Sequence, residues 1–257
     1  MEFREIGGPP QSAVERIWFA RGAEGIGETI LPDGRFELIF NFGDLVVQNG
    51  ESQPRSMLSA ETRRAVTIEP SGRVDFVGVT LRDGHAAKTL GIPLRLIRDR
   101  MLDLRDVRPR LDLHDRLAEV AGDEARAELV MRHLGAAECD ALAERAAMLI
   151  RRTSGRLSIS HLARSCGVTI RTLSRTFDRA FGLTPKTLAR VARLGHAASL
   201  LRSGESVAEA AGRAGFCDQS HMTNEFRMMA RLSPTRWNEG PDALAVQFLQ
   251  DAPPLPS

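Results

Sequence analysis

Two short groups of polar side chains have the residue types that recognise bases in duplex DNA. Arg171, Ser174 and Arg175 are spaced three and four residues apart, so on a helix they form one stripe. An arginine can donate two hydrogen bonds to O6 and N7 of guanine, and a glutamine such as Gln219 can bind N6 and N7 of adenine. Solvated surface charge is the ordinary alternative for exposed arginines, so the elements that hold these side chains decide between the two interpretations.

Those elements form an internal repeat over residues 159–237. Ala163 is followed four residues later by Gly167, and Ala211 is followed in the same way by Gly215. Alanine lets two helices approach closely, and glycine takes the positive φ that ends a helix, so each pair predicts a helix-turn-helix unit. The units are offset by 48 residues before each turn and by 49 after it. A coincidental match between two helical hairpins is the alternative.

The helices that follow the two turns have matching caps and apolar faces. Thr169 and Asp218 are good N-caps. Apolar residues stand four and eight positions after each cap, which places them on one buried face; they are Leu173, Phe177, Met222 and Phe226. Between the units, Thr184-Pro185 predicts the start of a connecting helix that ends at Ser203-Gly204. A length of about 28 Å suits two recognition helices in successive major grooves, which lie about 34 Å apart.

This region resembles the DNA-binding domain of the AraC/XylS family of bacterial transcription regulators. The resemblance rests on Leu173–Phe177, Phe181–Pro185, Gly215–His221 and Leu232–Pro234. It implies base contacts by Arg171, Ser174, Arg175, Gln219 and Ser220. It implies phosphate contacts by Thr169, Lys186, His221, Thr223, Arg227 and Arg236. Asn224 stands where the family usually has arginine, and Glu225 adds a negative charge beside it, so we expect stronger base reading by the first unit.

The charge of the chain is divided unevenly. Its 257 residues have a net charge of +2, but residues 151–240 have 15 Lys and Arg against 6 Asp and Glu, and the remainder has 20 against 27. A basic C-terminal half next to an acidic N-terminal half indicates that only the former meets a polyanion. No apolar run approaches the ~18 residues of a membrane span. No signal-peptide pattern begins the chain, so we expect a cytoplasmic protein.

The sequence offers no metal or cofactor motif. Cys139, Cys166 and Cys217 are far apart, and the histidines have no metal-ligand spacing. We therefore expect no metal, no cofactor and no disulfide framework. No pairing of a nucleophile with a base is evident either, so we expect no enzymatic activity.

The N-terminal half predicts an α+β arrangement. After an irregular segment at residues 1–15, short runs between turn residues predict strands at 16–20, 35–40, 45–48, 65–69 and 73–81, with a hairpin at Asn49-Gly50. Helical spacing follows at 85–90, 111–134 (divided at Gly122-Asp123) and 137–152. The strands predict an antiparallel, cupin-like barrel or sandwich followed by helices, ahead of an all-α C-terminal domain.

This half resembles the N-terminal domain of one AraC-family subgroup of uncharacterised regulators. The resemblance rests on Leu31–Gly34, Leu38–Asp44, Phe76–Val79 and Leu90–Pro93. It implies a small sensor barrel and helices that mediate dimerisation. The aromatic residues Trp18, Phe36, Phe40, Phe42 and Phe76 either line a pocket or form plain core, and we expect Phe36, Phe40 and Phe42 to face one side. Arg35 or Arg73 either meets an acidic effector or is exposed charge.

Together these features predict a sequence-specific transcription regulator. We expect a sensor and dimerisation domain over residues 1–152, a DNA-binding domain over 153–240 and a flexible tail over 241–257. Double-stranded DNA is the expected partner; an unidentified small-molecule effector, a second copy of the chain and, for an activator, RNA polymerase are further candidates. The resemblance implies activation of transcription, which is usual in this family, rather than repression. The alternatives are an enzyme-like barrel tethered to a DNA-binding module, and a non-specific DNA-binding protein with equal affinity for all sequences.

Overall fold

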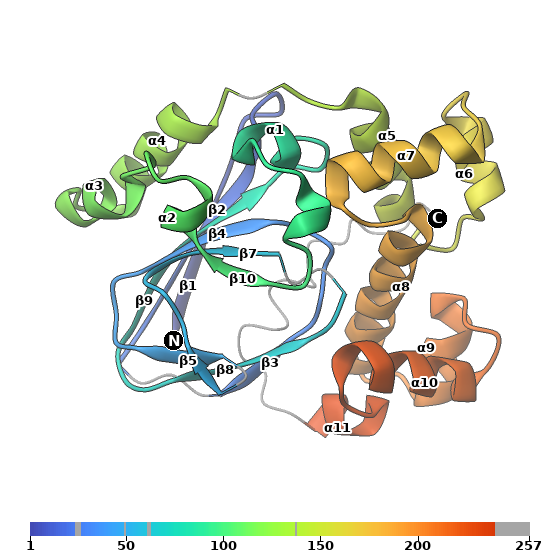
Figure 1. The fold of residues 1–257 in the computed structure, drawn as a ribbon. Helices are drawn as coiled ribbons and strands as arrows, with labels where there is room; N and C mark the ends of the chain where they lie inside the picture. The colour runs from blue at the N-terminus through green and yellow to red at the C-terminus, as the bar shows by residue number, and fades with distance from the viewer. Residues whose placement is uncertain (24–26, 49, 61–62, 137, 240–257) are drawn as a thin grey trace.

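A sheet-rich N-terminal half and a helical C-terminal half lie side by side (Figure 1). The structure, a computed structural model, describes residues 1–23, 27–48, 50–60, 63–136 and 138–239. The expected tail at 241–257 and the hairpin residue Asn49 lie outside the described residues. The arrangement confirms the α+β class predicted from the sequence.

The N-terminal half is an antiparallel sandwich, and its two sheets do not close into one barrel. A six-stranded sheet has the order β1 (Glu2–Gly7), β2 (Val14–Gly22), β9 (Val74–Leu81), β4 (Glu37–Asn41), β7 (Ser56–Ser59) and β10 (Met101–Asp103). A four-stranded sheet has the order β3 (Glu28–Ile30), β8 (Val66–Pro70), β5 (Val46–Gln48) and β6 (Glu51–Ser52). Every strand pair among the described residues is antiparallel, as predicted.

The expectation of an irregular segment at residues 1–15 is wrong. Glu2–Gly7 forms β1 and pairs along its length with β2, with Ile6 opposite Ile17. β1 is an edge strand, and most of its side chains are exposed. Its backbone hydrogen bonds to β2 stabilise it. Because few of its side chains are buried, its sequence shows little of the hydrophobic alternation from which a strand is predicted.

The two faces of the large sheet bury different aromatic residues. Phe36 and Phe40 are 2% and 0% exposed and pack in one cluster with the helices that follow the sheet. Phe42 packs against the same cluster, which confirms that these three rings share a side. Trp18 and Phe76 instead lie in the cluster between the two sheets. The five aromatic residues therefore do not line one pocket.

Short helices cover the outer face of the large sheet. Their bounds are α1 (Ala86–Leu90), the 3₁₀ helix η1 (Leu94–Leu96), α2 (Leu104–Val107), α3 (Leu113–Glu119) and α4 (Asp123–Leu134). α1 ends at Gly91, whose φ of 69° is left-handed, as its glycine predicts. The chain divides at Gly122 between α3 and α4, which confirms the break expected there.

The C-terminal half contains both predicted helix-turn-helix units. Its helices are α5 (Ala141–Arg152), α6 (Ile159–Ser165), α7 (Ile170–Phe181), α8 (Pro185–Arg202), α9 (Val207–Ala214), α10 (Gln219–Ala230) and α11 (Pro234–Glu239). Gly167 and Gly215 have φ values of 70° and 79°, so both turns use the conformation that the repeat predicts. α8, with 18 residues, is about 27 Å long.

The helix before the first unit shares the core of that unit. Ala143, Ala146 and Ile150 of α5 are at most 1% exposed and lie in the same cluster as Leu173 and Phe177 of α7. α5 therefore joins the helices of the C-terminal half, although the sequence-based division ends the N-terminal domain at residue 152.

A glycine in the large sheet makes room for one of its aromatic rings. Gly78 of β9 stands opposite Trp18 of β2, and a Cβ at Gly78 would lie 1.9 Å from the indole ring. We expect Gly78→Val to lower the free energy of unfolding by about 1–3 kcal/mol or more, because the ring must leave its place. Urea denaturation followed by circular dichroism measures this. Gly7→Val is the matched control, since nothing lies within 4 Å of its Cβ position; equal losses in both variants would contradict the packing.

Candidate nucleic-acid interface

The first unit presents a polar stripe because its apolar face is fully buried. Thr169 caps α7, and its hydroxyl accepts a hydrogen bond from the backbone N–H of Thr172 at 3.1 Å. Leu173 and Phe177 are both 0% exposed, as predicted. The candidate base-contact residues lie away from that face; Arg171 and Arg175 are exposed, and Ser174 is half-buried.

The second unit repeats this construction. The carboxylate of Asp218 caps α10 by accepting from the backbone N–H of His221 at 2.7 Å. Met222 and Phe226 are 0% exposed, and Gln219 and Ser220 are exposed. The His221 ring meets Phe216 edge-on at a centroid distance of 5.3 Å, which holds that side chain at the turn.

The candidate phosphate contacts are at the surface of both units. Thr169, Lys186, Arg227 and Arg236 are exposed, and His221 and Thr223 are half-buried. They come from the caps, first turns or outer faces of α7, α8, α10 and α11. Ten of the eleven residues that the resemblance implies are thus on helices whose other faces form the core, and Thr169 caps α7.

Ion pairing separates two sets of basic residues. Within the described part of the chain, none of five cations makes an ion pair; they are Arg171, Arg175, Lys186, Arg227 and Arg236. In contrast, Arg179 pairs with Asp140 at 2.6 Å, and Arg213 pairs with Glu205. The basic residues among the candidate DNA contacts thus have no carboxylate partner in the described residues, so their charge is available to a polyanion; the same holds for Arg164 and Arg231, which are not candidate contacts.

Glu225 is compensated by the connecting helix. Its carboxylate accepts from Nε and Nη2 of Arg190 on α8, at 2.9 and 3.1 Å. The Glu225 side chain is 13% exposed. The negative charge that was expected to weaken the second unit is therefore paired within the protein.

Comparisons with known proteins match the two halves of the chain separately. A family model described as a helix-turn-helix domain matches residues 162–240. A second, described as a domain of unknown function (DUF6597), matches residues 11–103. The transcriptional activator RhaS of Citrobacter koseri is 39% identical over 84 residues, which cover 32% of this chain and 30% of RhaS. RhaS of Klebsiella pneumoniae is 38% identical over the same length.

Residues 162–240 therefore form an AraC-type helix-turn-helix domain. The chain spans about 30% of the length of the curated relatives that it matches. An AraC-type regulator from Chromobacterium violaceum aligns with 38% of this chain and 90% of its own, with 24% identity and a TM-score of 0.37. ToxT of Vibrio cholerae aligns with 92% of this chain and 97% of its own, with 11% identity and a TM-score of 0.48.

The AraC-type domain contacts the N-terminal half through positions outside its polar stripes. Nη1 of Arg98 donates to the carbonyl of Gly182, where α7 ends, at 2.9 Å. The backbone N–H of Ala65 donates to the carbonyl of Met229 in α10 at 2.6 Å. A Cβ on Gly34 would lie 2.5 Å from the Leu188 side chain of α8. The N-terminal half therefore touches both units and their connecting helix.

A partly buried ion pair strengthens this contact. Nε and Nη2 of Arg151 on α5 donate to the Asp83 carboxylate at 2.6 and 2.9 Å, and its Nη1 donates to the carbonyl of Asp33 at 2.8 Å. Burial by itself raises the pKa of Asp83, but Arg151, with Arg35 and Arg82, outweighs it and holds that pKa below its usual range. Asp83 therefore stays ionised and paired at neutral pH.

Two hollows flank this contact. A cleft of about 570 Å³ lies between the N-terminal half, α5 and α8, and is lined by both signs of charge. A smaller cavity of about 90 Å³ lies between the two sheets. Trp18, Phe76, Arg35 and Glu37 are among the residues that line it, whereas Arg73 is exposed beside Asp75 at 3.2 Å. Burial, with the nearby Asp33 carboxylate, raises the pKa of Glu37.

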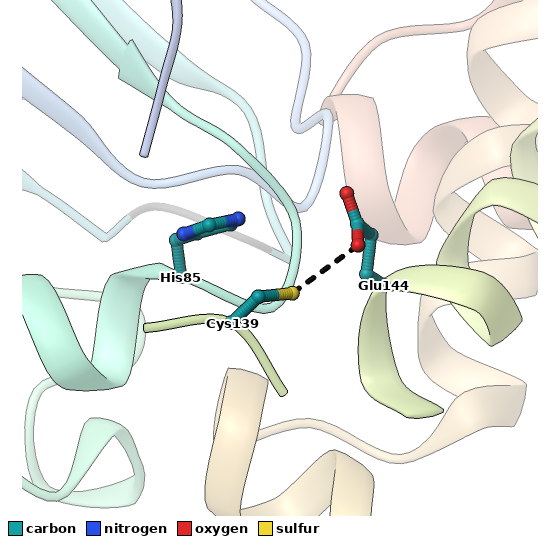
Figure 2. A group of neighbouring side chains, drawn as sticks. All are labelled: His85, Cys139 and Glu144. Atoms are coloured by element: carbon teal, nitrogen blue, oxygen red, sulfur yellow. Dashed lines mark hydrogen bonds between the residues drawn. The ribbon is translucent and has the colours of Figure 1, made fainter. Parts of the chain in front are cut away.

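Three side chains that are isolated in the sequence converge beside this contact. His85, Cys139 and Glu144 have ligand atoms within 4.8 Å of one another (Figure 2). Sγ of Cys139 donates to a carboxylate oxygen of Glu144 at 3.2 Å. Burial and this hydrogen bond raise the pKa of Cys139 to about 12, so the thiol is not a ready nucleophile. The spacing of metal ligands in the sequence does not predict this cluster, because His85 lies far along the chain from Cys139 and Glu144.

No helix among the described residues combines the length and apolarity needed to cross a bilayer.

The buried face of α7 can be tested against its exposed side. We expect Leu173→Asp to destabilise the AraC-type domain by about 4 kcal/mol or more, because the charge has no partner in the core. Ile170→Asp is the matched control on the same helix, since Ile170 is 50% exposed. Thermal unfolding by circular dichroism compares the two; a folded Leu173→Asp protein with unchanged melting would contradict the packing.

The Arg151–Asp83 pair predicts a pH-dependent loss of stability. Asp83→Asn should lower the free energy of unfolding by about 3–5 kcal/mol at pH 7, because it leaves the Arg151 charge unpaired. A depressed folded-state pKa stabilises the protein above the unfolded value of about 3.9 and loses that effect as pH falls through the folded value. The difference between variant and wild type should therefore shrink toward pH 3 in urea titrations. Asp112→Asn, at an exposed carboxylate, should change stability little at either pH.

Proposed function

We propose that this chain is a sequence-specific transcription regulator of the AraC/XylS family that reads two successive major grooves with α7 and α10. The observation that carries the proposal is the coincidence of exposure, hydrogen-bonding type and missing ion pairs on the outer faces of the two units. Two exposed basic residues elsewhere in the same domain, Arg179 and Arg213, have carboxylate partners, whereas Arg164 and Arg231 have none among the described residues. A missing ion pair therefore does not by itself single out the contact residues; their places on the outer faces of two capped, repeated helices support the proposal.

The two units divide the work of recognition. Arg171 and Arg175, with Ser174 between them, would contact base edges in one groove, and Gln219 and Ser220 would contact them in the next. Each good bidentate contact discriminates against a wrong base by about 1–3 kcal/mol. Thr169, Lys186, His221, Thr223, Arg227 and Arg236 would contact phosphates, which position the protein without specifying sequence. α8, about 27 Å long, would act as the spacer.

The N-terminal half would control this domain. Residues 1–152 would sense a small molecule, and residues 153–240 would bind DNA, with α5 packed into the latter. The cavity between the sheets is the candidate effector site, because it combines aromatic walls with the buried polar groups of Arg35 and Glu37. Control requires that the effector bind two arrangements of the halves with different affinity. The contacts at Gly182, Met229 and Arg151 offer the places where such arrangements could differ.

The remaining parts of the proposal follow the relatives. The RhaS relatives are named as activators. We propose activation here too, through RNA polymerase, in a cytoplasmic protein that acts as a homodimer. The rival function is non-specific DNA binding, which predicts equal affinity for all sequences, whereas a regulator should prefer its site by about 10³-fold or more.

Selection from a random duplex DNA pool at physiological salt tests the proposal. The full chain should enrich a motif with two elements about one helical turn apart. Arg171→Ala should relax one element, and Gln219→Ala the other, each by about 1–3 kcal/mol at one base pair. Lys186→Ala should weaken binding to all sequences alike and reduce its salt dependence.

Arg105→Ala is the matched control for loss of charge. Arg105 lies on α2 in the N-terminal half, is exposed and pairs with Asp103 at 2.6 Å. This variant should select the wild-type motif with unchanged affinity. Selection of the same motif by Arg171→Ala, or equal affinity of the wild type for all sequences, would refute the assignment of base contacts.

A further inference from the structure

The His85–Cys139–Glu144 cluster joins the two halves of the chain. His85 lies at the start of α1, Cys139 lies in the segment between α4 and α5, and Glu144 lies in the first turn of α5 (Figure 2). His85 is 4% exposed, and the other two residues are half-buried. None of the three contributes to the proposed DNA contacts.

We propose that these three side chains bind a divalent transition-metal cation of the Zn²⁺ type. An imidazole nitrogen, a thiolate sulfur and a carboxylate oxygen are all donors that Zn²⁺ accepts. Binding would release to solvent the thiol proton that Cys139 donates to Glu144, because a ligating sulfur is deprotonated. Three protein ligands leave the fourth tetrahedral position for water. Ca²⁺ and Mg²⁺ do not fit this donor set, because they prefer oxygen ligands.

The distances suit such an ion. Metal–ligand bonds of about 2.0–2.3 Å place tetrahedral donors about 3.5 Å apart. The Cys139 sulfur and the Glu144 oxygen are already 3.2 Å apart, and no separation among the three ligand atoms exceeds 4.8 Å. Closing the widest separation requires a shift of about 1 Å, which side-chain rotation can supply.

The backbone holds the three ligand segments together without an ion. The N–H of Asp140 donates to the carbonyl of Gly84 at 3.0 Å, and the Asp140 carboxylate caps α5 by accepting from the N–H of Ala143. Gly84 has a φ of +83°, and a Cβ there would lie 3.2 Å from the Cys139 sulfur. The loop that carries His85 is therefore fastened to the segment that carries Cys139.

The local charge also favours a cation. The Glu144 carboxylate is half-buried, and it makes no ion pair with Lys or Arg in the described residues; its recorded hydrogen-bond partner is the Cys139 thiol. The guanidinium of Arg82 is near enough to influence that thiol, but its Nε and Nη2 donate to the carbonyls of Ser12 and Pro9. A cation would give Glu144 a positive partner, which no Lys or Arg among the described residues supplies.

Binding would brace the contact between the halves. Asp140, next to Cys139, also accepts from Arg179 of α7 at 2.6 Å. An ion held by His85 and Glu144 would link the N-terminal half to α5 and, through this contact, lie close to the first recognition helix. The influence on DNA binding rests on the proposed function, whereas metal binding itself does not.

Titration of the reduced, metal-free full chain with Co²⁺ tests the site without DNA. Co²⁺ reports its ligands by absorption, and a thiolate ligand adds a charge-transfer band in the near ultraviolet. We expect this band to saturate at one Co²⁺ per chain and to disappear when Zn²⁺ displaces Co²⁺. Absence of a thiolate band in the wild type overturns the proposal.

Variants assign the ligands. Cys139→Ser should abolish the band, and His85→Gln and Glu144→Gln should each weaken Co²⁺ binding by about 10-fold or more. Cys217→Ser and His161→Gln are matched controls at exposed residues outside the cluster and should bind as the wild type does. A band that survives Cys139→Ser, or that Cys217→Ser removes, overturns the assignment. If Cys139→Ser does not fold by circular dichroism, the other two ligand variants decide, and unchanged affinity in both overturns it.

Zn²⁺ should also raise the melting temperature of the wild type, because an ion that binds only the folded chain stabilises it. The shift should be absent in Glu144→Gln and present in His161→Gln. A failure of the DNA selection with a positive Co²⁺ titration would refute the proposed function alone. The reverse result would refute the metal site alone.

Discussion

The structure of the DNA-binding half depends on the burial of one face of each recognition helix. Leu173 and Phe177 in α7, and Met222 and Phe226 in α10, are excluded from solvent. Because a helix has a fixed period, burying these positions turns the intervening polar residues outward. The glycine turns at the start of each unit and the capping side chains fix where each helix begins. The polar stripes are therefore a consequence of the core.

The N-terminal half is attached through a different kind of contact. A guanidinium–carboxylate pair, backbone hydrogen bonds to the ends of helices and a close approach at Gly34 join it to α5, α7, α8 and α10. Leu31 and Ala65 of the N-terminal half also join the apolar cluster of α8, α9 and α10. The polar contacts beside them are directional and replaceable. A protein whose two halves change their relative arrangement needs an interface whose contacts can be broken and replaced at a small difference in free energy. The cleft beside the pair and the three-ligand cluster both lie at this interface.

Sequence patterns succeeded where the determinants are local. The helix caps, the left-handed glycines and the apolar period of the C-terminal half depend on residues within a few positions of one another, and all were confirmed. They failed for β1, whose stability comes from pairing with β2. For the aromatic residues of the sheet, the expected common side of Phe36, Phe40 and Phe42 was confirmed, but the sequence left pocket and core as alternatives. Trp18 and Phe76 face the second sheet, while Phe36 and Phe40 face the helices, and strand parity within single segments does not specify which face meets which partner.

By itself, the sequence determined the two helix-turn-helix units, their spacing by α8 and the residues on their outer faces, because helical period and capping are encoded within each element. Tertiary structure decided which charges remain available. Arg190 compensates Glu225 across α8 and α10, while Arg171 and Arg175 have no such partner in the described chain. It also gathered His85 with Cys139 and Glu144, since the start of α1 meets the segment that leads into α5 only when the two halves of the chain pack together.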